Sequence, residues 1–245
     1  MRSSWLVGVS LSALAMFGVA ACSSSAGSGS SATTSGGGSS TGSPQNGGSY
    51  QLPAAVTSLR IDGDAVAVDV TAQEQAAGIN VTEQRHGRAT TTKDVTGSSA
   101  TLTGKCPSGF HFGESCSVEY TVTMPAQATL KVDNTTGDVK LMGPFADATI
   151  STSAGRLTGT ALGAGTYEVT TDVGESDLTF ATPPNSVKVK SDVGEVKLTV
   201  PGGTKYAVTT HTTVGSAQVA VDQDSSSTHR LDISTTVGAI QISKG

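Results

Sequence analysis

Four carboxylates, two in each of two similar stretches, are residues of this sequence whose types could do chemistry. The stretches are TTDVGESDLTF and KSDVGEVKLTV, and in each the acids stand on either side of a Val-Gly pair. Hard cations such as calcium prefer several oxygen ligands, so the four side chains could form one ion site if the stretches lie side by side. Solvated turn residues give the same pattern, and this is the interpretation we favour. The candidate ligands are Asp172, Glu175, Asp192 and Glu195.

Patterns that indicate catalysis are missing from the sequence. Neither G-x-S-x-G nor a P-loop occurs, and the histidines have no ligand spacing. Glycoside hydrolysis needs two carboxyl groups across a cleft, whereas the carboxylates above are expected in one surface column without aromatic neighbours. We therefore assign no catalytic residue, and an enzyme acting on wall polysaccharide is the least favoured function. The histidines are His86, His111, His211 and His229.

Two cysteines, Cys106 and Cys116, enclose the nine residues PSGFHFGES. In an exported chain such a pair most simply forms a disulfide, which would stabilise the fold by about 2 to 3 kcal/mol through loop closure. A redox or zinc site is the alternative, but the spacing fits neither C-x-x-C nor tetrahedral zinc ligation. We predict the disulfide.

The third cysteine, Cys22, follows an apolar run that is too short to span a membrane. We interpret residues 1–21 as a signal peptide, and VAAC at its end matches a bacterial lipobox. Cys22 would then carry a diacylglyceryl group and a further acyl chain such as palmitate, which together anchor a protein to a cell membrane. A soluble secretory signal that leaves Cys22 as an odd thiol is the alternative.

Residues 22–49 comprise this cysteine and a stretch of almost only Ser, Gly, Thr and Ala, a composition typical of a disordered tether. The whole chain has 15 Lys and Arg against 20 Asp and Glu, for a net charge of -5. This negative charge disfavours binding to nucleic acid. The expected location is the extracytoplasmic face of a bacterial membrane.

The rest of the chain is predicted to be all-β. Only 4% of the residues are aromatic, there are 30 glycines, and Thr, Val and Gly recur at short intervals. Residues 50–130 contain alternating apolar and polar segments separated by turn residues, and we expect an N-terminal strand region that includes the cysteine loop. Residues 131–245 form a second region with an internal repeat.

A glycine recurs every 18 to 23 residues in this second region. Because Gly tolerates positive φ, we expect each one to be a corner between two strands. These glycines are Gly137, Gly155, Gly174, Gly194, Gly215 and Gly238.

Each position around the repeated glycine holds residues of similar polarity in every repeat. Strand alternation predicts that positions five, three and one before the glycine, and two and four after it, face inward. The position three before is Asn, Ser or Thr, and we expect those side chains to form hydrogen bonds along the stack. The position one before is mostly Val, and its residues are Thr136, Ala154, Val173, Val193, Val214 and Val237.

Consecutive repeats are expected to stack in register, about 4.7 to 4.9 Å apart. Val193 would lie over Val173, and Arg156 between the carboxylates of Asp138 and Glu175. The predicted fold is a parallel β-solenoid with rungs of about 20 residues and an antiparallel N-terminal part. An antiparallel β-sandwich of hairpins gives a similar period and is the alternative.

The segment CSVEYTVTMPAQATLKVDNTTGDVKL, followed by recurring T-x-x-G-x-V/L-x-L rungs, resembles the bacterial putative-adhesin family of β-strand-repeat proteins, a domain of unknown function. The resemblance covers roughly residues 59–245. It implies a right-handed β-helix-like fold at the cell envelope and no catalytic residues. The expected function is a non-enzymatic adhesin-like or scaffold module that binds an envelope protein or polysaccharide, with a calcium-binding surface protein as the alternative.

Overall fold

The computed structural model describes residues 47–108 and 115–245, and all regular structure in these residues is β-strand. The predicted signal peptide, Cys22 and residues 23–46 of the tether lie outside the described residues. The strands are β1 (Gly47–Gln51), β2 (Ser58–Gln73), β3 (Asn80–Gly87), β4 (Thr90–Thr96), β5 (Ser99–Lys105), β6 (Cys116–Pro125), β7 (Thr129–Thr136), β8 (Val139–Met142), β9 (Asp147–Ala154), β10 (Leu157–Leu162), β11 (Thr166–Val173), β12 (Ser176–Phe180), β13 (Ser186–Val193), β14 (Val196–Val200), β15 (Ala207–Val214), β16 (Ala217–Ala220), β17 (Arg230–Val237) and β18 (Ile240–Lys244).

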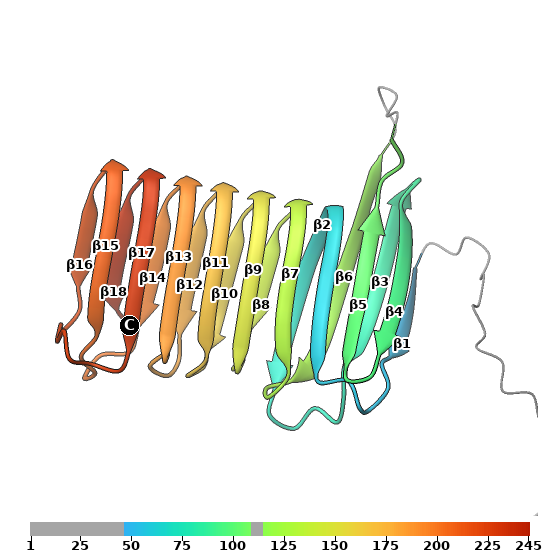
Figure 1. Ribbon diagram of the computed structural model, residues 1–245, viewed down its shortest axis with the longest axis horizontal. Helices are drawn as coiled ribbons and strands as arrows, with labels where there is room; N and C mark the ends of the chain where they lie inside the picture. The colour runs from blue at the N-terminus through green and yellow to red at the C-terminus, as the bar shows by residue number, and fades with distance from the viewer. Residues whose placement is uncertain (1–46, 109–114) are drawn as a thin grey trace, which may run out of the picture. The chain divides into compact units, whose positions relative to one another are not determined.

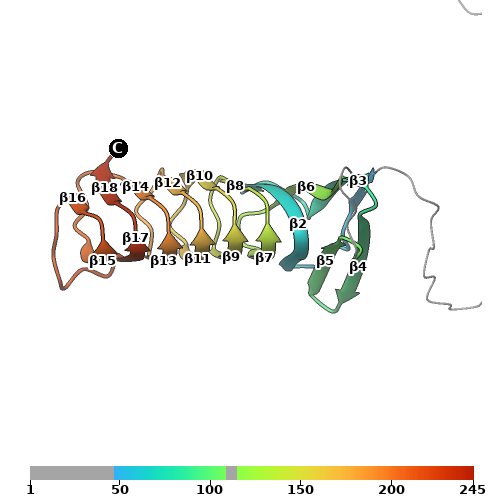
Figure 2. The same ribbon diagram turned by 90° about the horizontal axis from the view of Figure 1, so that it is seen from above.

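The strands of the domain form two facing rows, which Figure 2 shows from above. The first row has the order β4, β5, β2, β7, β9, β11, β13, β17, β15. The second row has the order β1, β3, β6, β2, β8, β10, β12, β14, β18, β16. Strand β2 is long enough to belong to both rows, and the core lies between them.

From β7 onward, one strand of each row and the glycine between them make a rung. Neighbouring rungs pair in parallel and in register, with Val173 beside Val193 and Leu178 beside Leu198. The antiparallel pairs are β1 with β3, β3 with β6, and β4 with β5. The parallel solenoid with an antiparallel N-terminal part is therefore confirmed, and the sandwich alternative is excluded.

The prediction that consecutive rungs stack in sequence order is wrong for the last two rungs. The final rung, β17 and β18, lies between β13/β14 and the β15/β16 rung, which forms the end of the row (Figure 1). Side-chain size explains this order, because β17 and β18 carry large aliphatic side chains that are almost fully buried, such as Leu231 and Ile233. The corresponding slots of β15 hold Val208 and Thr210, which are only half-buried. The rung with the larger apolar side chains is thus placed inside.

The glycine corner is confirmed by backbone geometry. Gly194 has φ of +155°, and a Cβ built on it would lie 1.7 Å from the carbonyl oxygen of Gly174 in the next rung. The other corner glycines face the carbonyl of a neighbouring corner glycine in the same way, except Gly137, which faces Val66 O of β2. The corners can therefore stack at rung spacing only without a side chain.

The predicted disulfide is confirmed, since Cys106 and Cys116 are bonded at the point where the chain passes from β5 to β6. The loop residues 109–114, including His111, lie outside the described residues.

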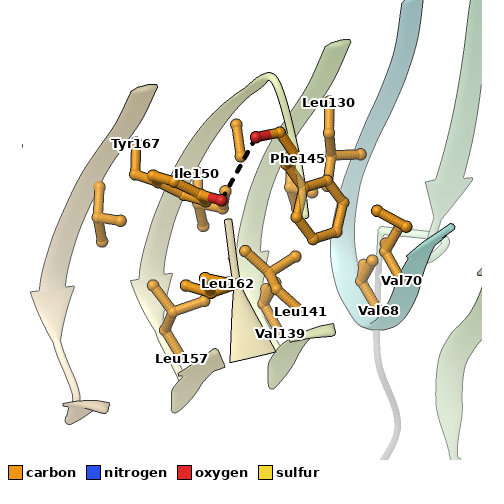
Figure 3. Packing of buried hydrophobic residues seen from close by; sticks show 14 of the residues in the cluster. Val68, Val70, Leu130, Val139, Leu141, Phe145, Ile150, Leu157, Leu162 and Tyr167 are labelled. Atoms are coloured by element: carbon orange, nitrogen blue, oxygen red, sulfur yellow. Dashed lines mark hydrogen bonds between the residues drawn. The ribbon is translucent and has the colours of Figure 1, made fainter. Parts of the chain in front are cut away.

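The pairing of one rung is irregular, and this irregularity makes room for a core side chain. Between Gly159 and Leu162 the pairing of β10 with β12 shifts, and Ala161 has φ of 53°. Gly159 leaves room that the Leu162 side chain fills, because a Cβ on this glycine would lie 2.7 Å from Leu162 Cδ1. Figure 3 shows Leu162 in the core, together with Tyr167.

Two buried tyrosines differ in how their hydroxyl groups are satisfied. Tyr167 Oη accepts a hydrogen bond from Gly163 N at 3.1 Å and lies 3.4 Å from Phe145 O, the contact dashed in Figure 3. Tyr120 is fully buried, and its hydroxyl has no hydrogen-bond partner among the described residues. Burial raises the pKa of both phenols, so both stay protonated at neutral pH.

We expect Tyr167→Phe to lower the free energy of unfolding by about 1 to 3 kcal/mol, because it leaves buried backbone groups unpaired. Tyr120→Phe is the matched control and should be neutral or stabilising, since it removes a buried hydroxyl without a partner. Urea denaturation followed by circular dichroism measures both. Equal losses for the two variants would contradict this assignment.

Candidate functional site

The predicted carboxylate column lies along the glycine corners, but its glutamates have protein partners. Arg156 Nη2 is 2.9 Å from Glu175 Oε2, and Lys197 Nζ is 3.0 Å from Glu195 Oε2. Gln241 Nε2 also donates to Glu195 Oε1 at 2.8 Å. Each glutamate would have to exchange these partners before it could bind a cation.

The expected position of Arg156 between two carboxylates is confirmed. Its side chain reaches Glu175, and its backbone N donates to Asp138 Oδ1 at 2.9 Å. Asp172 and Asp192 are exposed at the ends of their strands. Across residues 47–108 and 115–245, no group of three or more His, Cys, Asp and Glu side chains is placed to hold a metal ion.

The prediction that the valines one position before the glycine face inward is wrong. The exposed fractions are 54% for Val173, 46% for Val193, 42% for Val237 and 60% for Val214. The chain turns earlier than expected, because the register runs from Thr171 to Val173 without pairing the residue between them. Four consecutive rungs therefore carry one exposed valine each, and we call this row, Val173, Val193, Val237 and Val214, the valine ridge.

The polar column three positions before the glycine does face inward, as predicted. Where its side chains form hydrogen bonds along the stack, the partners are backbone carbonyls of the neighbouring rung. Asn134 Nδ2 donates to Val66 O at 2.8 Å, and Thr212 Oγ1 donates to Gly238 O at 3.1 Å. Thr152, Thr171 and Ser191 are buried without a partner among the described residues. This column completes the corners and offers no surface to a ligand.

A second candidate site, which the sequence did not indicate, is a polar groove on the outer face of the first row. It has a volume of about 390 Å³ and crosses β5, β2, β7 and β9. Arg60 lies in it, with Nε 2.7 Å from Asp62 Oδ2 and Nη2 3.1 Å from Asp133 Oδ2. Other lining residues are Asp64, Thr103, Lys105, Ser151 and Ser153.

The groove could not be found from sequence spacing, because Arg60 and Asp133 are 73 residues apart. They meet only because β2 lies between β5 and β7. We call it the Arg60 groove.

The electrostatics of the Arg60 groove keep its arginine charged. The hydrogen bond with Asp62 is the largest cause of the raised pKa of Arg60, and the charges of Asp62 and Asp133 add to it. Asp62 Oδ1 is buried and has no hydrogen-bond partner in the described part of the chain. The groove thus combines guanidinium donors, hydroxyl groups and the exposed carboxylates of Asp64 and Asp133, which suits a polar ligand rich in hydroxyl groups.

The model of the family described as Toastrack DUF4097 matches residues 121–243. The chain belongs to this family. The matched span of this Toastrack protein runs from within β6 to β18, so it contains all the rungs with a glycine corner. The β-strand-repeat domain of unknown function that the sequence resembled is thereby confirmed. No curated protein matches the chain.

Three solved structures are similar to this chain. One is named a "putative cell adhesion protein" from Clostridium sporogenes, with 13% identity, a TM-score of 0.46 and coverage of 81% of this chain and 99% of that chain. A "putative adhesin" from Bacteroides fragilis has 13% identity, a TM-score of 0.36 and coverage of 80% and 95%. A "putative lipid binding protein" from Parabacteroides distasonis has 11% identity, a TM-score of 0.31 and coverage of 82% and 97%.

The described residues contain no helix that could cross a membrane.

Proposed function

We propose that this protein is a non-enzymatic module that binds envelope polysaccharide and is held by a lipid on Cys22 at the extracytoplasmic face of a bacterial membrane. The Arg60 groove is the observation that carries the binding part. The lipobox VAAC and the following Ser/Gly-rich segment support the anchor.

Sugar hydroxyls both donate and accept hydrogen bonds, and the Arg60 groove offers groups of both kinds. Arg60 has guanidinium N–H groups, Asp64 and Asp133 supply exposed carboxylate oxygens, and Ser151 and Ser153 supply hydroxyls. Among the described residues, no aromatic side chain lines the groove, so each sugar would bind weakly. Many anchored copies on one surface would compensate for weak single contacts by avidity.

Arg60→Ala should weaken binding to purified cell-wall polysaccharide about tenfold or more, a loss of about 1.4 kcal/mol. Lys188→Ala is the matched control, because Lys188 lies in the same outward column of the first row, outside the groove, and pairs with Glu168 at 3.0 Å. Its binding should stay within about twofold of the parent. Biolayer interferometry on immobilised polysaccharide measures both. If the parent does not bind, or if both variants bind like the parent, the proposal is wrong.

Cys22→Ser should abolish lipid attachment, because it removes the atom that carries the lipid. Labelling with a palmitate analogue should be lost in the same variant. Cys106→Ser with Cys116→Ser is the control and should keep both the label and the membrane location. Undiminished palmitate labelling of the Cys22→Ser variant would refute the anchor.

A further inference from the structure

We propose that the valine ridge is a self-association surface on which a second copy of this chain packs antiparallel to the first. The ridge follows the C-terminal ends of β11, β13, β17 and β15, which lie in one line along the upper edge of Figure 1. Its four side chains are between 42% and 60% exposed on rungs that are adjacent in space. A contiguous apolar row of this kind on a polar solenoid indicates an interface.

The spacing of the ridge favours a second copy over other partners. Paired strands are about 4.7 to 4.9 Å apart, so the valines repeat at that distance along the row. An extended peptide presents side chains on one face about every 6.6 Å and loses register within a few residues. A second ridge has the identical repeat, so every valine can contact a valine of the other copy.

The charges beside the ridge set the direction of the second copy. The half formed by β11 and β13 is acidic through the exposed Asp172 and Asp192 next to its valines, whereas Glu175 and Glu195 are paired with Arg156 and Lys197. The half formed by β17 and β15 is uncharged, and the residues beside its valines are Thr213, Ser216, Thr236 and Ala239.

A parallel arrangement would place the acidic halves against each other, which like charges disfavour. The antiparallel arrangement places each acidic half against the uncharged half of the other copy. Asp172 then faces Thr213 of the partner subunit, whose hydroxyl can donate to the carboxylate. The contact is a two-fold, isologous one in which Val173 opposes the partner's Val214, and Val193 opposes the partner's Val237.

The size of the ridge implies a weak dimer. Three spacings give a row of about 14 Å, well short of the roughly 800 Å² that each partner buries in a standard interface. Concentration on a membrane through the proposed Cys22 anchor would raise the dimer fraction, but the geometry of the contact does not depend on that anchor.

Disulfide trapping tests the antiparallel contact in the full chain carrying Cys22→Ser. Val173→Cys and Val214→Cys are made separately, mixed and oxidised at high protein concentration. We expect the mixed dimer to exceed both homodimers about tenfold, because each residue faces the other and lies far from its own copy. Val95→Cys, an exposed valine of β4 away from the ridge, mixed with Val214→Cys gives the collision background.

Two outcomes would overturn the proposal: Val173→Cys homodimers as abundant as the mixed dimer, which indicates parallel packing, or a mixed dimer no more abundant than the Val95→Cys background. Adding Val193→Asp to both single-cysteine variants should abolish the mixed dimer while the circular dichroism melting curve stays unchanged, because Val193 is exposed. A persisting dimer would equally refute the ridge as the contact. Polysaccharide binding by the Arg60 groove is a separate measurement, so failure of one proposal does not imply failure of the other.

Discussion

Gly194→Ala should lower the free energy of unfolding by about 4 kcal/mol or more, a loss that is exceptional for a single substitution. The new Cβ would lie 1.7 Å from Gly174 O, an atom of backbone that is fixed by pairing on both sides. Neither rung can move away without breaking the parallel pairing of β11 with β13. Chemical denaturation monitored by circular dichroism measures the loss.

Alanine substitutions at two other glycines distinguish the steric clash from backbone strain as the cause of the expected loss of stability. Gly203 has φ of +80° but no atom within 4 Å of a built Cβ, so Gly203→Ala should cost about 1 to 2 kcal/mol from backbone strain alone. A Cβ built on Gly48 also meets no atom within 4 Å, and Gly48 has no positive φ that would disfavour a side chain. Gly48→Ala should therefore change the free energy of unfolding by less than about 0.5 kcal/mol. If all three variants lose the same stability, the close stacking of corners is not what requires glycine.

Leu231→Ala should destabilise the domain by about 2 to 5 kcal/mol, although it lies in the last rung of the sequence. Leu231 is 1% exposed, because β17 is enclosed by β13 and β15. Truncation leaves a cavity that the flanking rungs cannot fill.

Val208→Ala is the matched comparison for this prediction. Val208 pairs with Leu231 in the same slot but lies in the end rung and is half-buried. Its truncation should cost about 1 kcal/mol, since solvent already reaches the site. Stacking in sequence order would give the opposite ranking, so a larger loss for Val208→Ala than for Leu231→Ala would contradict the observed rung order.

The sequence alone was sufficient to predict the rungs of the solenoid. A glycine every 18 to 23 residues, apolar residues at fixed positions around it and a polar residue three before it all reflect local requirements. Strand alternation and the need for a corner without a side chain act within one repeat, so they can be read from one repeat. The same holds for the Cys106–Cys116 pair, whose members are close in sequence.

Whether the valine ridge faces the core or the solvent could not be predicted from a single repeat. Valine occupies both buried and exposed positions of these strands, such as Val169 and Val173. Whether these valines face the core or the solvent depends on whether the chain turns two residues before the glycine or at the glycine. Backbone pairing between rungs decides that turn.

The order of the rungs and the Arg60 groove were decided only by the tertiary structure. All rungs share one pattern, so each could pair with almost any other, and local sequence does not choose between neighbours. The choice follows from the total apolar area buried, which places the large aliphatic side chains of β17 and β18 inside and leaves β15 and β16 at the end. Strand β2 lies between β5 and β7, and only this placement brings Arg60 to Asp133.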